Sequence, residues 1–382
     1  MTLVREPAVL TGTHITPGPT ARTLDHPLVR QCPHLYCSPP WLLVEDRAHP
    51  GPAFHTWVEG EDFAAYAPSY GFDATSNPWP FARPDLFLAD GAEGEDPGPL
   101  LPAFTIGGRR PGHSRFHTAG PAWKRPQALT RLLGAAAEHA AERGASCLAA
   151  LYCSPEDADL RAAFLAHGGV RFPSHGTNVL GLPGDGFEDW MASLPRKQRA
   201  KEKADLRKLR EAEVEFEVSP LREADLEWIV PLELGLYGKH GHAYAVEEAA
   251  GLHRAYLDHL GADALVVRAR RDGTYVGFTS LVRRGSQAYV RQAGFDPEGC
   301  ADAPVYFGAA LHEPIRWAYG HGVRRLDLSI TADATKQRRG ARTRPREAWF
   351  VPLDDAARQH LHDLRERRDR SPLTPPTPKD PT

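Results

Sequence analysis

The chain has 382 residues, of which 41% are hydrophobic and 25% charged, a globular composition with room for two domains of ordinary size. The formal net charge of -3 argues against a protein that coats nucleic acid with its whole surface, but it leaves room for a local basic patch. No apolar run is long enough to span a bilayer, and the first residues contain Pro, Gly and Thr where a signal peptide needs an apolar core. We therefore expect a cytoplasmic protein without a membrane span.

The cysteines do not indicate a disulfide framework, because there are five of them, scattered over the chain. The segment Cys32-Pro-His34-Leu-Tyr-Cys37 has the residue types of half a metal site. A structural zinc site usually takes a second ligand pair further along the chain, and no pair follows at a suitable distance. We therefore expect no bound metal.

The two ends of the chain differ from the rest in composition. Residues 1–30 and 371–382 are rich in Pro and Thr and contain few apolar side chains. Such segments cannot offset the entropy lost on ordering, so we expect both to be disordered.

Helical and strand patterns alternate over residues 31–185, which is typical of an α/β domain. Two strands, a helix, a strand, a helix and a final strand are expected, in this order, at residues 85–89, 100–106, 126–143, 146–152, 154–167 and 178–182.

The second half, residues 212–370, has a clearer pattern. A strand, two helices, three antiparallel strands, a long helix and two strands are expected at residues 214–218, 222–237, 246–259, 264–270, 275–282, 287–292, 302–319, 324–328 and 347–351. This is the element order of a GNAT acyltransferase domain, and the first half shows the later part of the same order. The fold class is therefore predicted as α/β (α+β), with a degenerate GNAT-like domain and a complete one in tandem.

Three passages resemble the FemAB-like branch of the acyltransferases, a tandem-GNAT family. They are a basic helical segment between the two domains (residues 186–211), the helix and strand at residues 305–328, and Lys336-Gln-Arg-Arg-Gly340, which is similar to the family's Lys-x-x-Arg-Gly signature. The resemblance implies an enzyme that moves an acyl or aminoacyl group from a thioester or ester to an amine.

The loop that binds pyrophosphate in coenzyme A-dependent GNAT enzymes is altered here. Its equivalent is Arg291-Gln-Ala-Gly294-Phe-Asp296-Pro-Glu298, which keeps the first glycine but puts two carboxylates where phosphate would lie. The first half offers an even looser match, Arg109-Arg-Pro-Gly112-His-Ser. An acyl-CoA donor is therefore less favoured, although it remains an alternative.

The basic segment concentrates positive charge in a protein of net negative charge. Its acids are few, with Glu202 and Asp205 as the two in its middle. Such a helix suits a phosphate backbone, for example a tRNA acceptor arm. The alternative is a solvated face with i,i+4 ion pairs. The residues predicted to contact tRNA or phosphate are Arg196, Lys197, Arg199, Lys201 and Lys203.

Three residues are candidates for catalysis. Asp327 interrupts an apolar strand, and its carboxylate either accepts a proton from the attacking amine or forms an ion pair with a nearby arginine. Lys336 lies in a basic loop and has the charge to stabilise an oxyanion or to hold an anionic group of the acceptor. Tyr306 lies at the start of the long helix, near the expected cleft. Its hydroxyl either takes part in proton transfer or is the solvent-exposed end of a core residue.

Substrate-binding residues are predicted around these candidates, namely Arg339, Tyr289, Arg291 and His242. Each also has a structural alternative, as a surface or core residue. We expect no tightly bound cofactor.

The favoured hypothesis is an aminoacyltransferase that uses aminoacyl-tRNA and a small amine or peptide acceptor, such as a wall precursor or a secondary metabolite. One alternative is an acyl-CoA-dependent N-acyltransferase. Another is a non-catalytic module that binds nucleic acid or a peptidoglycan fragment. The sequence does not indicate the oligomeric state.

Overall fold

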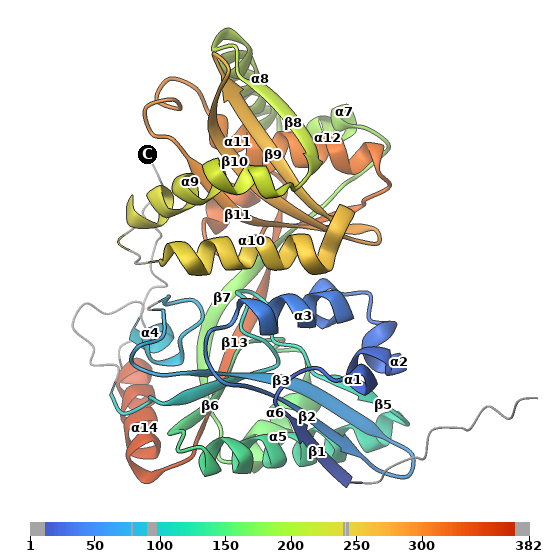
Figure 1. Cartoon of the computed structure of the whole chain (residues 1–382), viewed down its shortest axis with the longest axis vertical. Helices are drawn as coiled ribbons and strands as arrows, with labels where there is room; N and C mark the ends of the chain where they lie inside the picture. Colours follow the sequence, from blue (N-terminus) through green and yellow to red (C-terminus); the bar gives the residue numbers. More distant parts are fainter. Residues whose placement is uncertain (1–11, 78, 90–97, 240, 242–243, 371–382) are drawn as a thin grey trace, which may run out of the picture.

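The computed structural model describes residues 12–77, 79–89, 98–239, 241 and 244–370. One sheet runs through both halves of the molecule in the order β1-β2-β3-β4-β6-β13-β7-β12-β11-β10-β9-β8, with β5 paired to β3. Figure 1 shows the two halves stacked along the long axis and joined by β7 and β13. The strands are β1 (Gly12–Thr16), β2 (Ala53–Glu59), β3 (Ala64–Phe72), β4 (Ala103–Ile106), β5 (His117–Ala119), β6 (Cys147–Cys153), β7 (Val170–Gly181), β8 (Glu215–Pro220), β9 (Ala264–Arg271), β10 (Thr274–Arg284), β11 (Gln287–Phe295), β12 (Arg325–Asp327) and β13 (Arg342–Pro352).

Helices cover both faces of this sheet. The α-helices are α1 (Ala21–Asp25), α2 (Pro27–Arg30), α3 (Pro39–Ala48), α4 (Pro84–Ala89), α5 (Arg125–Glu142), α6 (Ala158–Ala166), α7 (Phe187–Ser193), α8 (Arg196–Glu211), α9 (Leu226–Lys239), α10 (Val246–Leu260), α11 (Val305–Phe307), α12 (Glu313–Gly320), α13 (Asp333–Gln337) and α14 (Asp355–Arg370). A π-helical turn (Gly308–His312) joins α11 to α12, and short 3-10 turns lie at Leu35–Cys37, Ala122–Lys124, Glu223–Asp225 and Gly261–Asp263. Among the described residues, no helix has the length and apolarity needed to cross a bilayer.

Alternation along β6 separates the two faces of the N-terminal half. Leu148 and Ala150 belong to the core under α5 and α6, whereas Ala149 and Leu151 belong to the core under α4 and α14. Successive side chains of a strand point to opposite faces, so β6 is covered on both sides. This explains why its sequence is continuously apolar.

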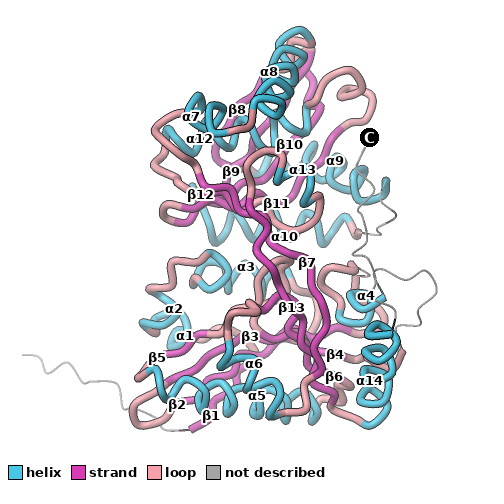
Figure 2. Tube along the Cα trace, turned by 180° about the vertical axis from the view of Figure 1, so that it is seen from behind, coloured by secondary structure: helices cyan, strands magenta, loops and turns pink. Residues whose placement is uncertain are grey.

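The two halves exchange strands. β7 is the last strand of the N-terminal half in sequence, but it pairs antiparallel with β12 of the C-terminal half. β13 ends the C-terminal half but pairs with β6 of the N-terminal half. β7 and β13 also pair with each other over most of their length, as Figure 2 shows from behind. Each half therefore needs a strand from the other to complete its sheet.

Several expectations differ from the structure. Residues 85–89 form a helix, α4, rather than a strand. The predicted disorder of residues 1–30 is wrong from residue 12 onward, because β1 pairs with β2 and Val29 is buried; residues 1–11 and 371–382 lie outside the described residues. The last strand, which the sequence assigns to the C-terminal domain, lies in the sheet of the N-terminal half instead.

Candidate active site

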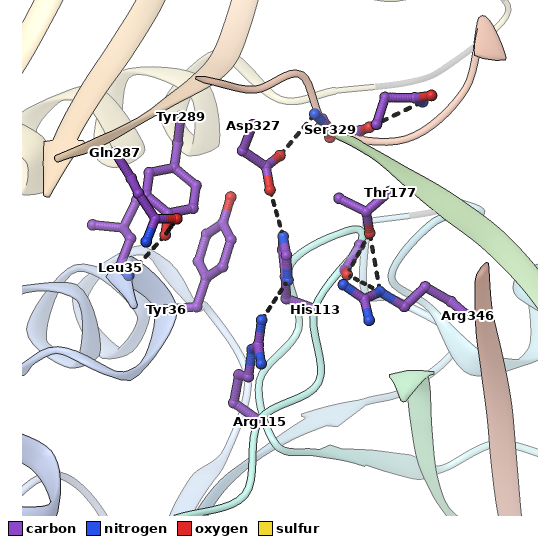
Figure 3. A network of polar contacts seen from close by, with 12 residues as sticks. Leu35, Tyr36, His113, Arg115, Thr177, Gln287, Tyr289, Asp327, Ser329 and Arg346 are labelled. Carbon is purple, nitrogen blue, oxygen red and sulfur yellow. Dashed lines mark hydrogen bonds and ion pairs between the residues drawn. The ribbon is translucent and has the colours of Figure 1, made fainter. Parts of the chain in front are cut away.

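The site forms where β11 and β12 part. The two strands pair in parallel up to Tyr289 opposite Asp327, after which β11 continues to Phe295 while β12 ends. The chain then turns through Ser329, whose φ of 62° lies in the left-handed region. This turn leaves the Asp327 carboxylate at the end of its strand, facing the N-terminal half, as Figure 3 shows.

The N-terminal half supplies the residue that meets Asp327. The loop after β4 turns back at Gly112, whose φ is 90°. A Cβ added to Gly112 would lie 2.9 Å from Oγ1 of Thr177, so only glycine fits there. Ser114 anchors the loop, because its amide donates to the carbonyl of Tyr152 (3.1 Å) and its Oγ accepts from the amide of Tyr152 (3.1 Å). His113, between these two anchors, projects toward the C-terminal half.

His113 and Asp327 form a buried pair between the halves. Nε2 of His113 lies 2.7 Å from Oδ2 of Asp327, and the amide of Ser329 donates to Oδ1 of the same carboxylate (2.8 Å). A guanidinium nitrogen of Arg115 lies 3.2 Å from Nδ1 of His113. Because arginine can only donate, Nδ1 is the acceptor and Nε2 carries the proton that Asp327 accepts.

The charges of this pair are fixed by its surroundings. Desolvation lowers the pKa of His113 to about 4, although the carboxylate of Asp327 opposes the shift. The pKa of Asp327 is lowered; burial opposes this shift, but the electrostatic interaction and hydrogen bond with His113 and the hydrogen bond from the amide of Ser329 outweigh it. At neutral pH the pair is therefore a neutral imidazole that orients an anionic carboxylate.

Cationic side chains converge on this carboxylate. Nζ of Lys336 donates to the carbonyl of Ile330 (2.6 Å). Desolvation lowers the pKa of Lys336 to about 8, and the negative charges of Asp333 and Asp327 partly offset that shift. Nε of Arg346 donates to the carbonyl of Gly112 (3.0 Å), and desolvation with the charge of Arg115 lowers its pKa to about 10.

Aromatic rings form the other wall of the site. The ring of His34 lies 4.6 Å from that of His113 and 5.5 Å from that of Tyr289 between centroids. The hydroxyl of Tyr289 accepts from the amide of Leu35 (3.2 Å). Tyr36 stands beside His113, with ring centroids 5.0 Å apart, and its hydroxyl accepts from Arg291 (2.5 Å).

A pocket between α3, the loop after β4 and α10 adjoins this wall. It is lined by His49, Trp79, Arg109, Arg110, Tyr244 and Glu248, among others. Trp41 links the pocket to the site, because the guanidinium carbons of Arg110 and Arg291 lie 5.9 Å and 6.0 Å from its ring. Glu45 pairs with both Arg109 and Arg110, so the cationic charge of the pocket is partly balanced.

The structure brings together some of the predicted site residues and separates others. Asp327 and Lys336 lie in one site, with Tyr289 in its wall and Arg291 behind Tyr36. Asp327 pairs with His113, not with an arginine of the loop that follows it. Tyr306 is 40% exposed, and its ring contacts Phe295 and Phe307. His242 lies outside the described residues.

Arg339 is buried under α8. Its guanidinium lies 3.2 Å from the carboxylate of Glu202 and 3.3 Å from that of Asp205. Glu202 also bonds to His312 (2.7 Å), and the guanidinium lies over the ring of Phe307 at 3.6 Å. The guanidinium is thus held by two carboxylates of α8, so Arg339 fastens α8 to the segment that carries Lys336.

The same network explains the charge distribution of α8. Its buried residues are Glu202, Asp205 and Leu209, which share one face at helical spacing. Glu211 pairs with Arg207 at the end of the helix (3.4 Å). The helix therefore turns its central acids inward and most of its cations outward; the exposed ones are Arg196, Lys197, Lys201, Lys203, Arg207, Lys208 and Arg210.

Asp296 lies in the loop after β11, which the sequence resemblance makes equivalent to the pyrophosphate loop of coenzyme A-dependent GNAT enzymes. Its carboxylate accepts from the amides of Glu298 (3.1 Å) and Gly299 (3.1 Å). Free amides before a helix are what make such a loop an anion site. Here two of them are already bonded to a carboxylate within the loop.

Sequence reasoning missed His113, Tyr36 and Arg346 as site residues. His113 belongs to the segment Arg109-Arg-Pro-Gly112-His-Ser, which the sequence indicates only as a weak phosphate loop. The available signal for His113 was the position of this segment, which is equivalent to that of the loop after β11 in the other half.

Comparisons with known proteins agree with this architecture. Residues 196–337 match the family described as an acetyltransferase (GNAT) domain. The fold is similar to the crystal structure of FemX, with a TM-score of 0.57 and 13% identity over 88% of this chain and 96% of that chain. It is also similar to a tandem GNAT protein from the clavulanic acid biosynthesis pathway (TM-score 0.52, 15% identity, 90% and 99% covered). L-PGS from Bacillus licheniformis gives a TM-score of 0.50 with 10% identity, over 92% and 97%. A search of curated proteins gave no match.

Proposed function

We propose that the chain is an acyltransferase that forms an amide by moving an aminoacyl group from aminoacyl-tRNA to an amine. The match of residues 196–337 to a GNAT domain and the likeness of the fold to FemX and to a tandem GNAT protein support this proposal. The observation that carries the proposal is the Asp327 carboxylate, held by His113 and Ser329 where the two halves meet. An anionic carboxylate there suits an acceptor that arrives as an ammonium ion.

The residues of the site have distinct roles in this proposal. Asp327 has too low a pKa to be an efficient base at neutral pH, so it binds and orients the acceptor amine and stabilises the positive charge that develops on its nitrogen. His113 is a positioning residue, because both of its ring nitrogens are engaged. Lys336, with a pKa of about 8, is poised to exchange a proton near neutral pH.

The proposed reaction proceeds through a tetrahedral intermediate. The bound ammonium ion first loses one proton to solvent, and the neutral amine nitrogen then attacks the ester carbonyl carbon. The resulting oxyanion is stabilised by the charges of Lys336 and Arg346. The bond from that carbon to the ribose oxygen then breaks, and Lys336 gives its proton to the leaving oxygen. The new amide nitrogen loses a proton, which restores the charge on Lys336.

Three observations support tRNA as the donor. The outward cations of α8 form a surface suited to a phosphate backbone. Arg339 fastens α8 to the segment of α13, which carries Lys336, so a donor lying along α8 approaches the site across one short helix. Asp296 fills part of the loop that a coenzyme A pyrophosphate would need.

The test is a transfer assay with a broad amine panel. Charged tRNA carrying labelled amino acids and a set of acyl-CoA compounds are supplied in parallel to the purified protein. The proposal predicts label transfer from tRNA to an amine, with loss of at least about a hundredfold in the Asp327→Asn variant. Consumption of acyl-CoA alone would replace the proposed donor, and consumption of neither would contradict the transfer itself.

A further inference from the structure

We propose that Cys32, Cys37 and His117 form a binding site for one divalent metal ion of the zinc class, which fastens the segment from Cys32 to Cys37 beside the active site. The sulfur atoms of the two cysteines and a ring nitrogen of His117 lie within 4.8 Å of one another. A zinc ion with tetrahedral ligands would hold the sulfurs about 3.8 Å apart, given zinc–sulfur bonds of about 2.3 Å. Binding therefore requires the two sulfurs to move together by no more than about 1 Å.

The fold supplies a ligand that the linear sequence does not reveal. A 3-10 turn at Leu35–Cys37 brings Cys37 back toward Cys32, with the amide of Cys37 bonded to the carbonyl of His34 (3.2 Å). His117 comes from β5, where it lies opposite Tyr66 of β3. The sequence-based expectation of no metal was based on a missing second pair, but a set of two thiolates and one imidazole needs no second pair.

His117 has the hydrogen bonding of a metal ligand. Its Nδ1 lies 3.1 Å from the carbonyl of Leu28, and a carbonyl can only accept, so Nδ1 carries the proton. The bare Nε2 is then the nitrogen free for coordination. Histidine ligands of metals usually donate their other ring proton to a carbonyl or carboxylate in this way.

The cysteines are suited to a thiolate site. Cys32 is partly exposed, whereas Cys37 is buried, so an ion has a route from solvent. The positive charges of Arg115 and Arg284 lie close enough to Cys32 to favour its thiolate form. Two thiolates and a neutral imidazole balance the charge of a divalent cation, and a water molecule would complete a tetrahedron.

The site would stabilise the wall of the active site. The segment between the two cysteines carries His34, which contacts His113. It also carries Leu35, which bonds to Tyr289, and Tyr36, which bonds to Arg291. An ion bound to Cys32, Cys37 and His117 would tie this segment to β5. Its role is structural and does not depend on which donor or acceptor the enzyme uses.

The test measures metal content and metal binding on the full chain. Protein purified under reducing conditions without chelators is analysed for metals, then stripped and titrated with Zn²⁺ or Co²⁺. We expect one ion per chain, a thiolate-to-cobalt charge-transfer band, and a rise in Tm of about 3 °C at a hundredfold excess over the dissociation constant.

Two variants and a control identify the ligands. Cys32→Ser with Cys37→Ser removes both thiolates, and His117→Asn removes Nε2 while its amide still donates to Leu28. Each is expected to weaken binding by at least about a hundredfold. Cys300→Ser, which changes a partly exposed cysteine outside the cluster, should bind as the wild type does.

Several outcomes would overturn the proposal. They are a wild type without metal uptake or Tm shift, variants that bind as well as the wild type, or a Cys32–Cys37 disulfide in freshly isolated protein that takes up no metal after reduction. If the variants fail to fold, the wild-type cobalt spectrum decides, because a spectrum without thiolate bands contradicts the assignment.

Discussion

Nε2 of His113 lies 2.7 Å from Oδ2 of Asp327, although 214 positions separate the two residues in sequence and they belong to different halves of the chain. Both are buried, at 4% and 6% exposure. The pair therefore makes the position of the carboxylate depend on how the two halves pack.

Removing the hydrogen bond from His113 should impair activity more than replacing the ring by another donor. His113→Ala leaves the carboxylate buried without its partner, whereas the amide of His113→Gln reaches the position of Nε2 and still donates. We expect His113→Ala to lower kcat by about a hundredfold and to destabilise the fold by about 1–3 kcal/mol, with His113→Gln recovering much of both. Transfer rates and denaturant unfolding measure these effects. Equal losses in the two variants would contradict a positioning role.

The activity should decrease above about pH 8. Lys336, whose pKa is lowered to about 8 by desolvation, must be charged to stabilise the oxyanion, so each further pH unit costs about a factor of ten. Lys336→Arg keeps its charge at these pH values and should show a lower plateau without the alkaline limb. Single-turnover transfer, corrected for spontaneous ester hydrolysis, tests this; an alkaline limb that persists in Lys336→Arg would assign it to another group.

The sequence alone identifies part of the site and the basic helix. Asp327 stands out because a carboxylate interrupts an apolar strand, and a charge run identifies α8. The helical spacing of Glu202, Asp205 and Leu209 also indicates which face α8 buries. The exchange of β7 and β13 has no local signal, because each strand pairs with partners far away in sequence.

There are also physical reasons why the sequence does not reveal some helices and strands. Residues 85–89 are a short apolar run, which periodicity alone cannot assign to a strand or a helix. The buried strands β2 and β3 contain His, Ser, Pro and Tyr among their apolar residues, which hides the pattern of a core strand. His113 could not be paired with Asp327 before the halves were placed together.

Acid should destabilise the protein steeply between about pH 6 and pH 4. Desolvation lowers the pKa of His49 to about 3, that of His113 to about 4, and that of His34 well below its usual value. The unfolded chain takes up these protons near pH 6.5 and the folded chain does not, so stability falls as pH falls. Each such histidine contributes about 1.4 kcal/mol per pH unit while the pH lies between its pKa values in the unfolded and folded chain.

One variant isolates a single histidine in that measurement. Nε2 of His49 lies 3.0 Å from the carbonyl of Gly71, and the amide of His49→Gln can replace this bond without titrating. Its unfolding free energy should fall with pH less steeply, by about 1.4 kcal/mol per unit. His362→Asn, at an exposed position on α14, is the control. An unchanged slope in His49→Gln would contradict the prediction.

Arg339 should contribute mainly to the stability of the fold and not to substrate binding. Arg339→Met leaves Glu202 and Asp205 buried without their cation, and we expect a loss of about 3 kcal/mol in unfolding free energy. The neighbouring Arg338 is exposed, so Arg338→Met should change stability by less than about 0.5 kcal/mol. If Arg339→Met unfolds like Arg338→Met but transfers no amino acid, Arg339 contacts substrate and the structural assignment is wrong.

The donor prediction concerns the outward face of α8. Lys197, Lys201 and Lys203 are exposed there, whereas Arg199 donates to the carbonyl of Ala192 and is better left intact. Changing the three lysines to Glu should weaken tRNA binding and lower the slope of log affinity against log salt by about 2–3. The control changes Arg358, Arg365 and Arg367 to Glu. These residues lie on α14, at the opposite end of the molecule in Figure 1.

The most direct test compares two donors in the α8 variant, Lys197→Glu/Lys201→Glu/Lys203→Glu. One is intact aminoacyl-tRNA; the other is a short aminoacylated CCA fragment that carries the same ester but cannot reach α8. We predict that the variant loses at least about tenfold in kcat/KM with the intact tRNA and keeps the wild-type value with the fragment. Equal values for variant and wild type with intact tRNA would contradict the proposal that α8 guides an aminoacyl-tRNA to Asp327.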